Sequence, residues 1–331
     1  MKQALTSAAV RTAASLGGGT NVIVTILDDG TELLQTNLTS LTLTSGSVTV
    51  VPASGVNFTL DLDTKTLTLN KGYSLQGIQI ISRDPAGSNT TPAAAIILAA
   101  DGTPLKNINI DCRSITTGNV SSNVSSVGGG DKCVHVQSSV RVTVILDNVD
   151  ISIPSDQNFV TGILHEGIGT LKVINGSSVV AAGSGNAQGV VGIYGKRAPG
   201  SSGPSGSVEV RDSTVSLSAI TATGGNVFSI LLSAPTSSGK VERSSIQVRE
   251  GNSSSEIAIG VCVNTPNSTV TVQGNTFTNT NLPQGQAPTS IAIYKQAGDV
   301  VPTPPTTGNN FTGFSIPSQD NRYKESGSSC S

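Results

Sequence analysis

The sequence predicts an all-β solenoid, because two periodic signals run in phase through its second half. The first signal is a window with apolar residues at its first, third, eighth and tenth positions, and it occurs five times. The windows start 29, 37, 31 and 31 residues apart, and 17 of the 20 positions are apolar. The five sets are Val142/Val144/Val149/Ile151, Leu171/Val173/Ser178/Val180, Val208/Val210/Val215/Leu217, Gly239/Val241/Ile246/Val248 and Val270/Val272/Phe277/Asn279.

The second signal is a further short alternating segment after each window. Its middle residue lies 18 to 20 residues after the third position of the window. The five middle residues are Gly162, Gly192, Ser229, Gly260 and Ala292. Two markers that keep phase through a variable spacer indicate a structural repeat of about 30 residues.

Each repeat is predicted to hold three short strands. The apolar period is two, which is typical of strands and not of helices. Small polar residues that tolerate tight turns separate the first two strands. These pairs are Asp147-Asn148, Asn175-Gly176, Asp212-Ser213, Arg243-Ser244 and Gly274-Asn275. Each repeat therefore reads as one coil of a parallel β-helix, in which every strand pairs with its copy in the next coil and stacking supplies the core.

Two details fit this frame. The long interval of 37 residues is explained by an inserted loop at residues 196–206. The outward position of the first strand should also form a column down the stack, in which opposite charges on neighbouring strands favour the register. That column reads Thr143, Lys172, Glu209, Lys240 and Thr271.

The first half follows the same plan less regularly. Leu60/Leu62/Leu67/Leu69 fits the window, and Ile108/Ile110/Ile115 fits it without the last position. Further strands are expected at residues 22–27, 41–43, 48–50, 78–80 and 96–98, and residues 116–130 read as a long loop. The expected total is nine or ten three-strand coils.

One elongated domain is predicted. Residues 1–19 form an N-terminal cap or flexible arm, residues 20–297 the parallel β-helix, and residues 298–331 a Pro-containing linker and polar tail. The tail could cap the last coil, dock on a partner or be mobile. Capping has the clearest physical reason, since an open sheet edge exposes unpaired backbone groups.

The coil length, the three strands per coil and the polar turn columns together resemble the right-handed parallel β-helix superfamily. That group includes pectate-lyase-like enzymes, phage tailspikes and bacterial adhesins. The resemblance covers residues 20–297 and is architectural, because no family-specific motif accompanies it. It implies a single-stranded right-handed parallel β-helix and, if the chain is an enzyme, a groove on the flank with stacked carboxylates.

Composition narrows the classes of partner. A net charge of −2 without a basic stripe argues against nucleic acid. No apolar run is long enough for a membrane span, and the start of the chain is a poor signal peptide. The absence of a Cys-x-x-Cys pair argues against a zinc site, and no cofactor is expected. An extracellular surface or a virion is the expected location.

The four cysteines leave the redox compartment open. They are Cys112, Cys133, Cys262 and Cys330. Cys112 and Cys133 flank the expected loop at residues 116–130. They could form a disulfide, but free thiols are the favoured interpretation.

The search for catalytic residues finds no column of acids in successive coils. Asp61 and Asp63 share one face of one strand, while Asp147, Asp150 and Asp212 read as solvated turn or outward residues. One polar cluster follows the third strand, and its members are His165, Glu166, Lys196 and Arg197, with His135 about one coil earlier. A histidine, a carboxylate and two bases could form an acid–base site. An inter-coil ion pair is the favoured alternative.

A better supported feature is an apolar ridge. If the apolar residues of the third strands face inward, two residues of each strand should face outward. These are the middle residue and the residue two positions after it. The second of these columns reads Leu164, Tyr194, Leu231, Cys262 and Tyr294. An exposed stripe of this length would mark an interface, for example with sister chains in a three-fold bundle. Alternatively, the C-terminal tail or a long loop covers it.

These observations favour a non-enzymatic structural or adhesive protein, such as a surface, fibre or virion spike module that presents loops on a rigid rod. Its partners would be copies of itself in a trimer, sister surface or virion proteins, or a glycan. The alternative is a polysaccharide lyase or glycoside hydrolase. The chain has no Trp and only four Tyr, so it offers few aromatic platforms for sugar rings. Ice binding is disfavoured, because the Thr-x-Thr fragments do not recur in successive repeats.

Overall fold

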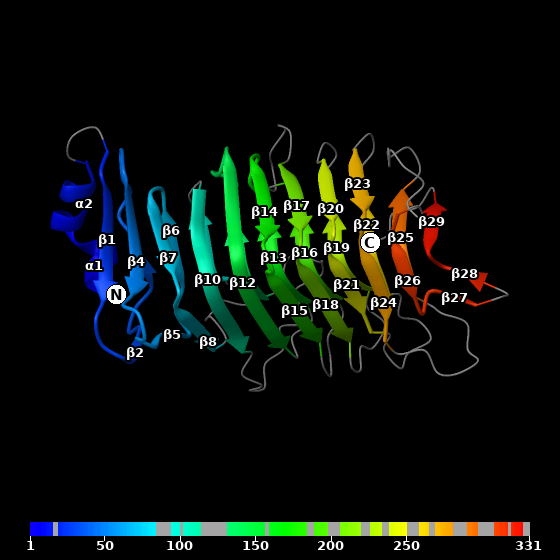
Figure 1. Cartoon of the computed structure of the whole chain (residues 1–331), viewed down its shortest axis with the longest axis horizontal. Helices are drawn as coiled ribbons and strands as arrows, with labels where there is room; N and C mark the ends of the chain where they lie inside the picture. The colour runs from blue at the N-terminus through cyan, green and yellow to red at the C-terminus, as the bar shows by residue number, and fades with distance from the viewer. Residues whose placement is uncertain are drawn as a thin grey trace.

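The computed structural model shows a parallel β-helix in which successive coils stack along one axis (Figure 1). It describes residues 1–15, 19–83, 94–99, 102–113, 131–155, 159–183, 189–197, 206–219, 226–233, 238–249, 258–264, 269–280, 290–296, 308–316 and 319–326. Two short helices, α1 (Lys2–Thr6) and α2 (Ala8–Ser15), precede the strands. Within these ranges no helix is long and apolar enough to cross a membrane.

Two long parallel sheets form the walls of the solenoid. The ten-stranded sheet takes the third strand of each coil. Its strands are β3 (Leu38–Thr39), β6 (Leu67–Asn70), β9 (Ala94–Ala99), β11 (Asp131–Val136), β13 (Phe159–His165), β16 (Gly189–Gly195), β19 (Asn226–Leu232), β22 (Ala258–Val263), β25 (Ile291–Gln296) and β29 (Tyr323–Ser326).

The 17-stranded sheet takes the first and second strands. The first strands are β1 (Asn21–Ile26), β4 (Ser47–Pro52), β7 (Tyr73–Gln76), β10 (Gly102–Arg113), β12 (Thr143–Ser155), β14 (Thr170–Ile174), β17 (Ser207–Arg211), β20 (Gly239–Glu242) and β23 (Val270–Gln273). The second strands are β2 (Gly30–Leu33), β5 (Phe58–Asp63), β8 (Gln79–Arg83), β15 (Ser178–Gly183), β18 (Thr214–Ala219), β21 (Ser245–Val248), β24 (Thr276–Asn279) and β26 (Asn310–Thr312). A small antiparallel hairpin pairs β27 (Ser315–Ile316) with β28 (Gln319–Asp320).

The described residues contain about seven three-strand turns, and not the expected nine or ten. The difference arises because β10 and β12 each run through the turn between the first and second strands. Those two coils therefore contribute two strands instead of three. Beyond the last full coil, β26 and β29 continue the two sheets but do not complete a coil of the same form.

The observed register confirms most of the repeat frame and corrects its phase at two places. Val208, Gly239 and Val270 align as expected. Leu171, however, pairs with Val144, so Val142 lies outside the frame and is 60% exposed. In the next coil Val179 and Ala181 face the core, where the window had placed Ser178 and Val180. The preceding turn holds two residues with positive φ, Asn175 and Gly176, and this extra residue shifts the strand by one.

The first half shows a second phase error. Leu60 pairs with Ile80, and Ile80 pairs with Ile110, so these residues form the column of second strands. Leu67 and Leu69 belong to β6 in the other sheet. The window fitted because the turn at residues 64–66 has about the length of the turn between first and second strands.

The turns between first and second strands are held by their backbone conformation. From Asn107 onward each described turn of this kind has a residue with positive φ, and the series is Asn107, Asn148, Asn175 (with Gly176), Asp212, Arg243, Gly274 and Gly308. A serine or asparagine that follows satisfies buried backbone groups of the neighbouring coil. Ser244 N–H donates to Asn275 Oδ1 over 2.9 Å, and Asn275 N–H donates to Asn309 Oδ1 over 2.8 Å. The predicted polar turns are therefore confirmed, and their side chains link successive coils.

The two ends of the main core are closed differently. At the N-terminal end Leu5 and Ala14 of the two helices are buried, and Leu41 N–H donates to Leu5 O over 3.1 Å. At the C-terminal end the ring of Phe311 stacks on Phe277 with centroids 5.2 Å apart, and Phe314 is buried. Residues from the expected tail thus cover the last coil.

A disulfide joins Cys112 at the end of β10 to Cys133 in β11. The expectation of free thiols was wrong for this pair. The two cysteines can pair because Cys112 lies near the end of β10 and Cys133 lies near the start of β11, the next strand of the same coil. Cys262 is also disulfide-bonded. Cys330 and the expected loop at residues 116–130 lie outside the described residues.

Candidate functional site

The strongest polar cluster lies where three third strands end. His135 Nε2 donates to Glu166 Oε2 over 2.9 Å, and Lys196 Nζ lies 3.3 Å from Glu166 Oε1. These contacts follow from the parallel register, in which His135 pairs with Leu164 and His165 pairs with Gly195. Residues that follow the strands in successive coils therefore meet at one corner. The predicted proximity of Glu166 to Lys196 and His135 is confirmed.

The environment of Glu166 keeps its carboxylate ionised. Burial is the largest single influence and on its own would raise the pKa of Glu166. The hydrogen bond and charge of His135, together with Lys196, outweigh this effect and lower the pKa. A carboxylate with both oxygens paired and a lowered pKa is poorly suited to donate a proton near neutral pH. The arrangement fits an inter-coil ion pair.

His165 does not join this cluster, because strand alternation turns its side chain toward the core. Its ring is 1% exposed, and Nε2 donates to Gly169 O over 3.1 Å. Nδ1 is buried, and none of the described residues forms a hydrogen bond with it. Burial lowers the pKa of His165 to about 4, so the ring is neutral at physiological pH. A Cβ at Gly206 would lie 2.6 Å from Nε2, which shows how closely the chain packs against this ring.

Two residues that the sequence does not assign to this cluster extend it into the next coil: Tyr194, which is predicted as part of the apolar ridge, and Ser233, which is not predicted at all. Lys196 Nζ lies 5.7 Å from the centre of the Tyr194 ring, and Ser233 Oγ donates to Tyr194 Oη over 2.9 Å. The buried Arg197 Nε has no hydrogen-bond partner among the described residues, and no contact joins Arg197 to Glu166 there. The four expected residues are therefore split between an ion pair, a buried histidine and a separate arginine. Only the column register could have pointed to Ser233.

Other acidic residues are engaged in pairs of the same kind. Asp147 contacts Lys106 at 2.9 Å and accepts a hydrogen bond from Asn175 over 2.7 Å. The hydrogen bonds from Asn175 and Lys106 lower the pKa of Asp147. Asp61 is buried and pairs with Arg83 at 2.8 Å. Within the described ranges no three His, Cys, Asp or Glu side chains converge as metal ligands would.

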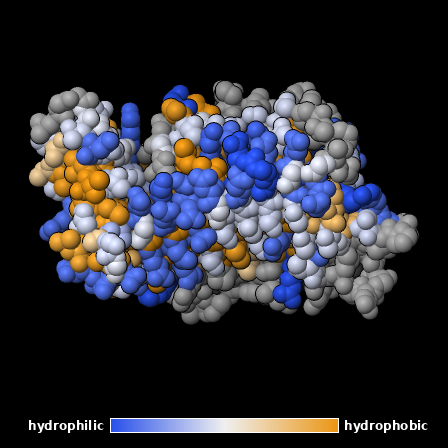
Figure 2. Space-filling view, viewed as in Figure 1, coloured by the Kyte–Doolittle hydropathy of each residue, from blue (hydrophilic) through white to orange (hydrophobic). Residues whose placement is uncertain are grey.

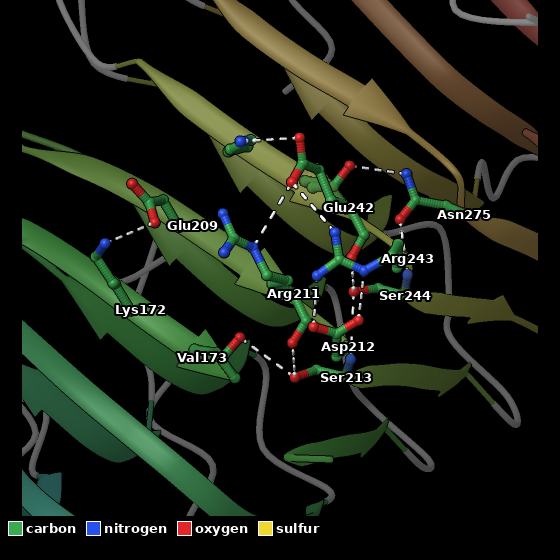
Figure 3. Close-up of polar contacts among 12 residues, drawn as sticks. Lys172, Val173, Glu209, Arg211, Asp212, Ser213, Glu242, Arg243, Ser244 and Asn275 are labelled. Atoms are coloured by element: carbon green, nitrogen blue, oxygen red, sulfur yellow. Dashed lines mark hydrogen bonds and ion pairs between the residues drawn. The ribbon is translucent and has the colours of Figure 1, made fainter. Parts of the chain in front are cut away.

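The outer face of the first strands carries a ladder of ion pairs (Figure 3). Lys172 contacts Glu209 at 3.0 Å across neighbouring coils, as the charge column predicted. Lys240 contacts Glu242 of its own strand at 2.9 Å, although its register partner is Glu209. Thr143 pairs with Thr170 and not with Lys172, which is the same phase error that affected Val142. Such exposed pairs favour the register more than the stability.

One column on the outer face of the second strands is polar and largely uncharged. One outward residue per strand aligns through nine consecutive coils. The column reads Thr59, Gln79, Asn109, Asp150, Ser178, Thr214, Ser245, Thr276 and Asn310. Eight of the nine carry a neutral hydroxyl or amide, and Asp150 carries the one carboxylate. The sequence search missed this column because the turn before each strand varies in length.

The apolar ridge exists as a column but is not exposed. Its members pair in the expected register, and each is at most 8% exposed. They are Leu164, Tyr194, Leu231, Cys262 and Tyr294. They belong to a second hydrophobic core on the outer side of the ten-stranded sheet. The prediction of an exposed interface at these residues was therefore wrong, since the ridge is buried within the single chain.

The middle residues of the third strands face the opposite way from the prediction. A Cβ at Gly192 would lie 2.7 Å from Val215 Cγ1, a side chain of the main core. The alternation is interrupted at this residue, so Val191 and Tyr194 both face the second core while Ile193 faces the main core. A one-residue break reverses which side chains face outward. The same break places Phe228, Ile259 and Ile291 in the second core.

In the part of the chain that the structure describes, fold and site together define a parallel β-solenoid in which ion pairs join several neighbouring coils. Neither a protein-family model, nor a curated protein sequence, nor a solved structure matches the chain significantly.

Proposed function

We propose that the chain is a non-enzymatic structural or adhesive module, a rigid rod that presents loops and one polar face at a surface, on a fibre or on a virion. The observation that carries this proposal is the outward column from Thr59 to Asn310. Neutral hydroxyl and amide groups recur there at the strand spacing of about 4.8 Å. Such a face offers hydrogen-bond donors and acceptors in many copies, which suits weak multivalent binding to a neutral glycan.

Two further observations support the proposal. The candidate acid–base cluster is internally paired, because both oxygens of Glu166 contact bases of neighbouring coils. The disulfide bonds of Cys112, Cys133 and Cys262 suit an oxidising compartment, as expected for an extracellular surface.

A glycan-binding assay with matched variants tests this function. Thr276→Lys places a cation in the polar column, whereas Thr271→Lys makes the same change on the neighbouring first strand of that coil. We expect binding of neutral glycans to fall at least tenfold for Thr276→Lys and to stay unchanged for Thr271→Lys. Equal loss in both variants, or no glycan binding by the unmodified chain, contradicts the adhesive role of this face.

The alternative is a carbohydrate-active enzyme that uses Glu166. This carboxylate and its two partners are half-buried, so solvent still reaches them. Hydrolysis by paired carboxylic acids needs a second acid within about 10 Å. The contacts of Glu166 among the described residues are bases. A glycan-cleavage screen on the unmodified chain and on Glu166→Gln distinguishes the two functions. Cleavage that disappears in Glu166→Gln favours the enzyme and sinks the structural proposal.

A further inference from the structure

The second hydrophobic core is buried although it lies on the outer side of a wall. Its members are each exposed by 8% or less. By contrast, Ile23, Leu27 and Leu33 are exposed by 48% or more at the N-terminal end, where Figure 2 shows a hydrophobic area and Figure 1 places β1. Outward apolar side chains are buried to the degree seen in the second core only if further chain lies over them.

Cys262 is the member of this core that has a covalent partner. Its side chain faces outward, because the neighbouring Val261 and Val263 belong to the main core. Cys262 is fully buried and disulfide-bonded. The described elements that pack most closely against β22 are β19 and β25 of its own sheet and β21 of the other sheet. None of these strands lies over the outer side of Cys262, so its partner comes from another part of the chain.

The cysteine count leaves one partner within the chain. The sequence holds four cysteines, and Cys112 and Cys133 are bonded to each other. Cys330 is the cysteine that remains for Cys262. Forming the bond removes two hydrogen atoms from the two thiols, and a small-molecule disulfide or a disulfide-exchange protein accepts them and is reduced to two thiols. The bond between Cys112 and Cys133 requires an oxidant of the same class.

The register places the end of the described chain within reach of Cys262. β29 pairs with β25, which pairs with β22, so Cys262, Tyr294 and Lys324 form one row across the three strands. Ser326 follows Lys324 by two residues, and the Cα atoms of Ser326 and Cys262 are therefore about 12 Å apart at usual strand spacings. The four residues from Ser326 to Cys330 span up to about 14 Å, and a disulfide bridges about 5.5 Å more between Cα atoms. The tail can therefore turn back over the sheet and reach Cys262 while β29 stays in place.

The last residues of the chain need such a bond to stay on the sheet. Residues 327–331 read Gly-Ser-Ser-Cys-Ser, so the cysteine is the one apolar side chain among them. Glycine and serine are small enough to lie close over an apolar row, but they bury little apolar area that could offset the entropy lost on ordering them. A covalent bond holds the segment where packing alone would not.

We infer that Cys262 is bonded to Cys330 of the same chain, and that residues 327–331 lie over Cys262 on the outer side of the ten-stranded sheet. All strands from β23 to β29 lie between the two cysteines in the sequence. The bond therefore closes a loop that contains the whole C-terminal end of the solenoid and ties this end back to β22. In an oxidising compartment the end is locked against fraying, and reduction releases it.

Peptide mapping of the full chain without reductant tests the pairing. Trypsin cuts after lysine and arginine and places the four cysteines on four separate peptides. We expect peptide 325–331 to be linked to peptide 250–295, in a protein that keeps the 33.4 kDa mass of one chain on a non-reducing gel. Any other link of peptide 325–331, or a Cys330 that reacts with an alkylating reagent before reduction, overturns the inference. A link found only in a covalent dimer overturns it as well, because the bond then joins two copies.

Alkylation of the folded variant Cys330→Ser tests what lies over Cys262. Without its bond the tail should leave the sheet, and iodoacetamide should label Cys262 within tenfold of the rate in the urea-unfolded variant. Ser329→Ala is the control, since it changes the tail but keeps the bond and should leave Cys262 unlabelled. If labelling of Cys262 requires unfolding, other parts of the chain cover it and the inference about the tail is overturned. If Cys330→Ser folds poorly, mild reduction of the unmodified protein frees the same thiol for the same measurement.

Hydrogen exchange in β29 tests the lock. The amides of β29 should exchange at least tenfold faster in Cys330→Ser than in the unmodified chain, because the tail no longer ties this strand to β22. The double variant Cys112→Ser/Cys133→Ser is the matched control, since it removes the other disulfide and should leave exchange in β29 unchanged. Equal rates in the unmodified chain and in Cys330→Ser overturn the lock, because β29 is then held by its pairing with β25 alone.

Discussion

Arg243 forms a two-pronged ion pair with Asp212 one coil earlier, with Nε to Oδ1 and Nη2 to Oδ2 both at 2.7 Å. Both residues have a positive φ, 48° for Arg243 and 50° for Asp212. Aspartate tolerates this conformation better than arginine does, because its short polar side chain bonds locally. The turn at Arg243 therefore combines a strained backbone with an exposed ion pair that fixes the register of two coils.

Substitutions at Arg243 should separate backbone strain from the ion pair. Arg243→Ala removes the ion pair and keeps the strain, whereas Arg243→Gly removes both. We expect Arg243→Gly to have the higher free energy of unfolding of the two variants, as measured by urea denaturation. If Arg243→Ala is the more stable, the positive φ at this turn costs nothing.

The pH dependence of stability should report the burial of His165. Its pKa falls from 6.5 to about 4 on folding, so the native state leaves the ring neutral where the unfolded chain would protonate it. The free energy of unfolding is therefore not reduced by His165 above about pH 6.5, and it decreases as the pH falls toward 4. The shift corresponds to a loss of about 3 kcal/mol in the free energy of unfolding.

His165→Gln is the control for this experiment, because glutamine can keep a hydrogen bond to Gly169 O but does not titrate. The difference in unfolding free energy between the parent and His165→Gln, measured from pH 7 to pH 4, isolates the histidine from Glu166 and His135. A difference that stays constant with pH would show that His165 keeps its ordinary pKa in the folded chain.

Gly192 should not tolerate a side chain. A Cβ there would lie 2.6 Å from the Ser229 carbonyl oxygen and 2.7 Å from Val215 Cγ1, so two coils would have to separate. We expect Gly192→Ala to lower the free energy of unfolding by about 1–3 kcal/mol, as measured by chemical denaturation. Ser229→Ala in the next coil is the matched control and should cost less than about 1 kcal/mol, because its Cβ is already accommodated. Equal losses would mean that the break in alternation is not tightly packed.

The disulfide between Cys112 and Cys133 should stabilise the chain through its loop. The two cysteines are 21 residues apart, and closing a loop of this length contributes about 3 kcal/mol in the chain-entropy model. The double variant Cys112→Ser/Cys133→Ser should lose about this amount in denaturation experiments under oxidising conditions. Under reducing conditions the gap between parent and variant should close. A gap that persists after reduction points to packing of the sulfur atoms.

The fold could be predicted from the sequence because the coils repeat their pattern, whereas the phase of individual strands could not. A window of fixed spacing assumes turns of constant length. The extra residue at Asn175-Gly176 breaks that assumption. Val180 is therefore exposed, although the window predicts it in the core. The break at Gly192 escaped notice for a related reason, since glycine carries no apolar signal that would show which way its position faces.

The candidate site was predicted in its contacts but not in its environment. Register alone brought Glu166 beside Lys196 and His135, and this relation depends only on counting residues between coils. Burial depends on what covers a face, which counting does not reveal. For that reason the register groups His165 with Glu166, although the two side chains point to opposite sides of the wall. The register likewise does not show that the ridge at Leu164 is buried.

The second hydrophobic core has a consequence for how the chain can vary. In β16 and β22 every residue is buried, because the ten-stranded sheet is covered on both faces there. In β17 burial alternates, because one face meets solvent. A saturation mutagenesis profile should therefore oscillate with a period of two along β17 and stay uniformly intolerant along β16 and β22. One wall of the solenoid is free to diversify its outward positions, and the other is constrained at every position of the strands β16 and β22, which the second core covers.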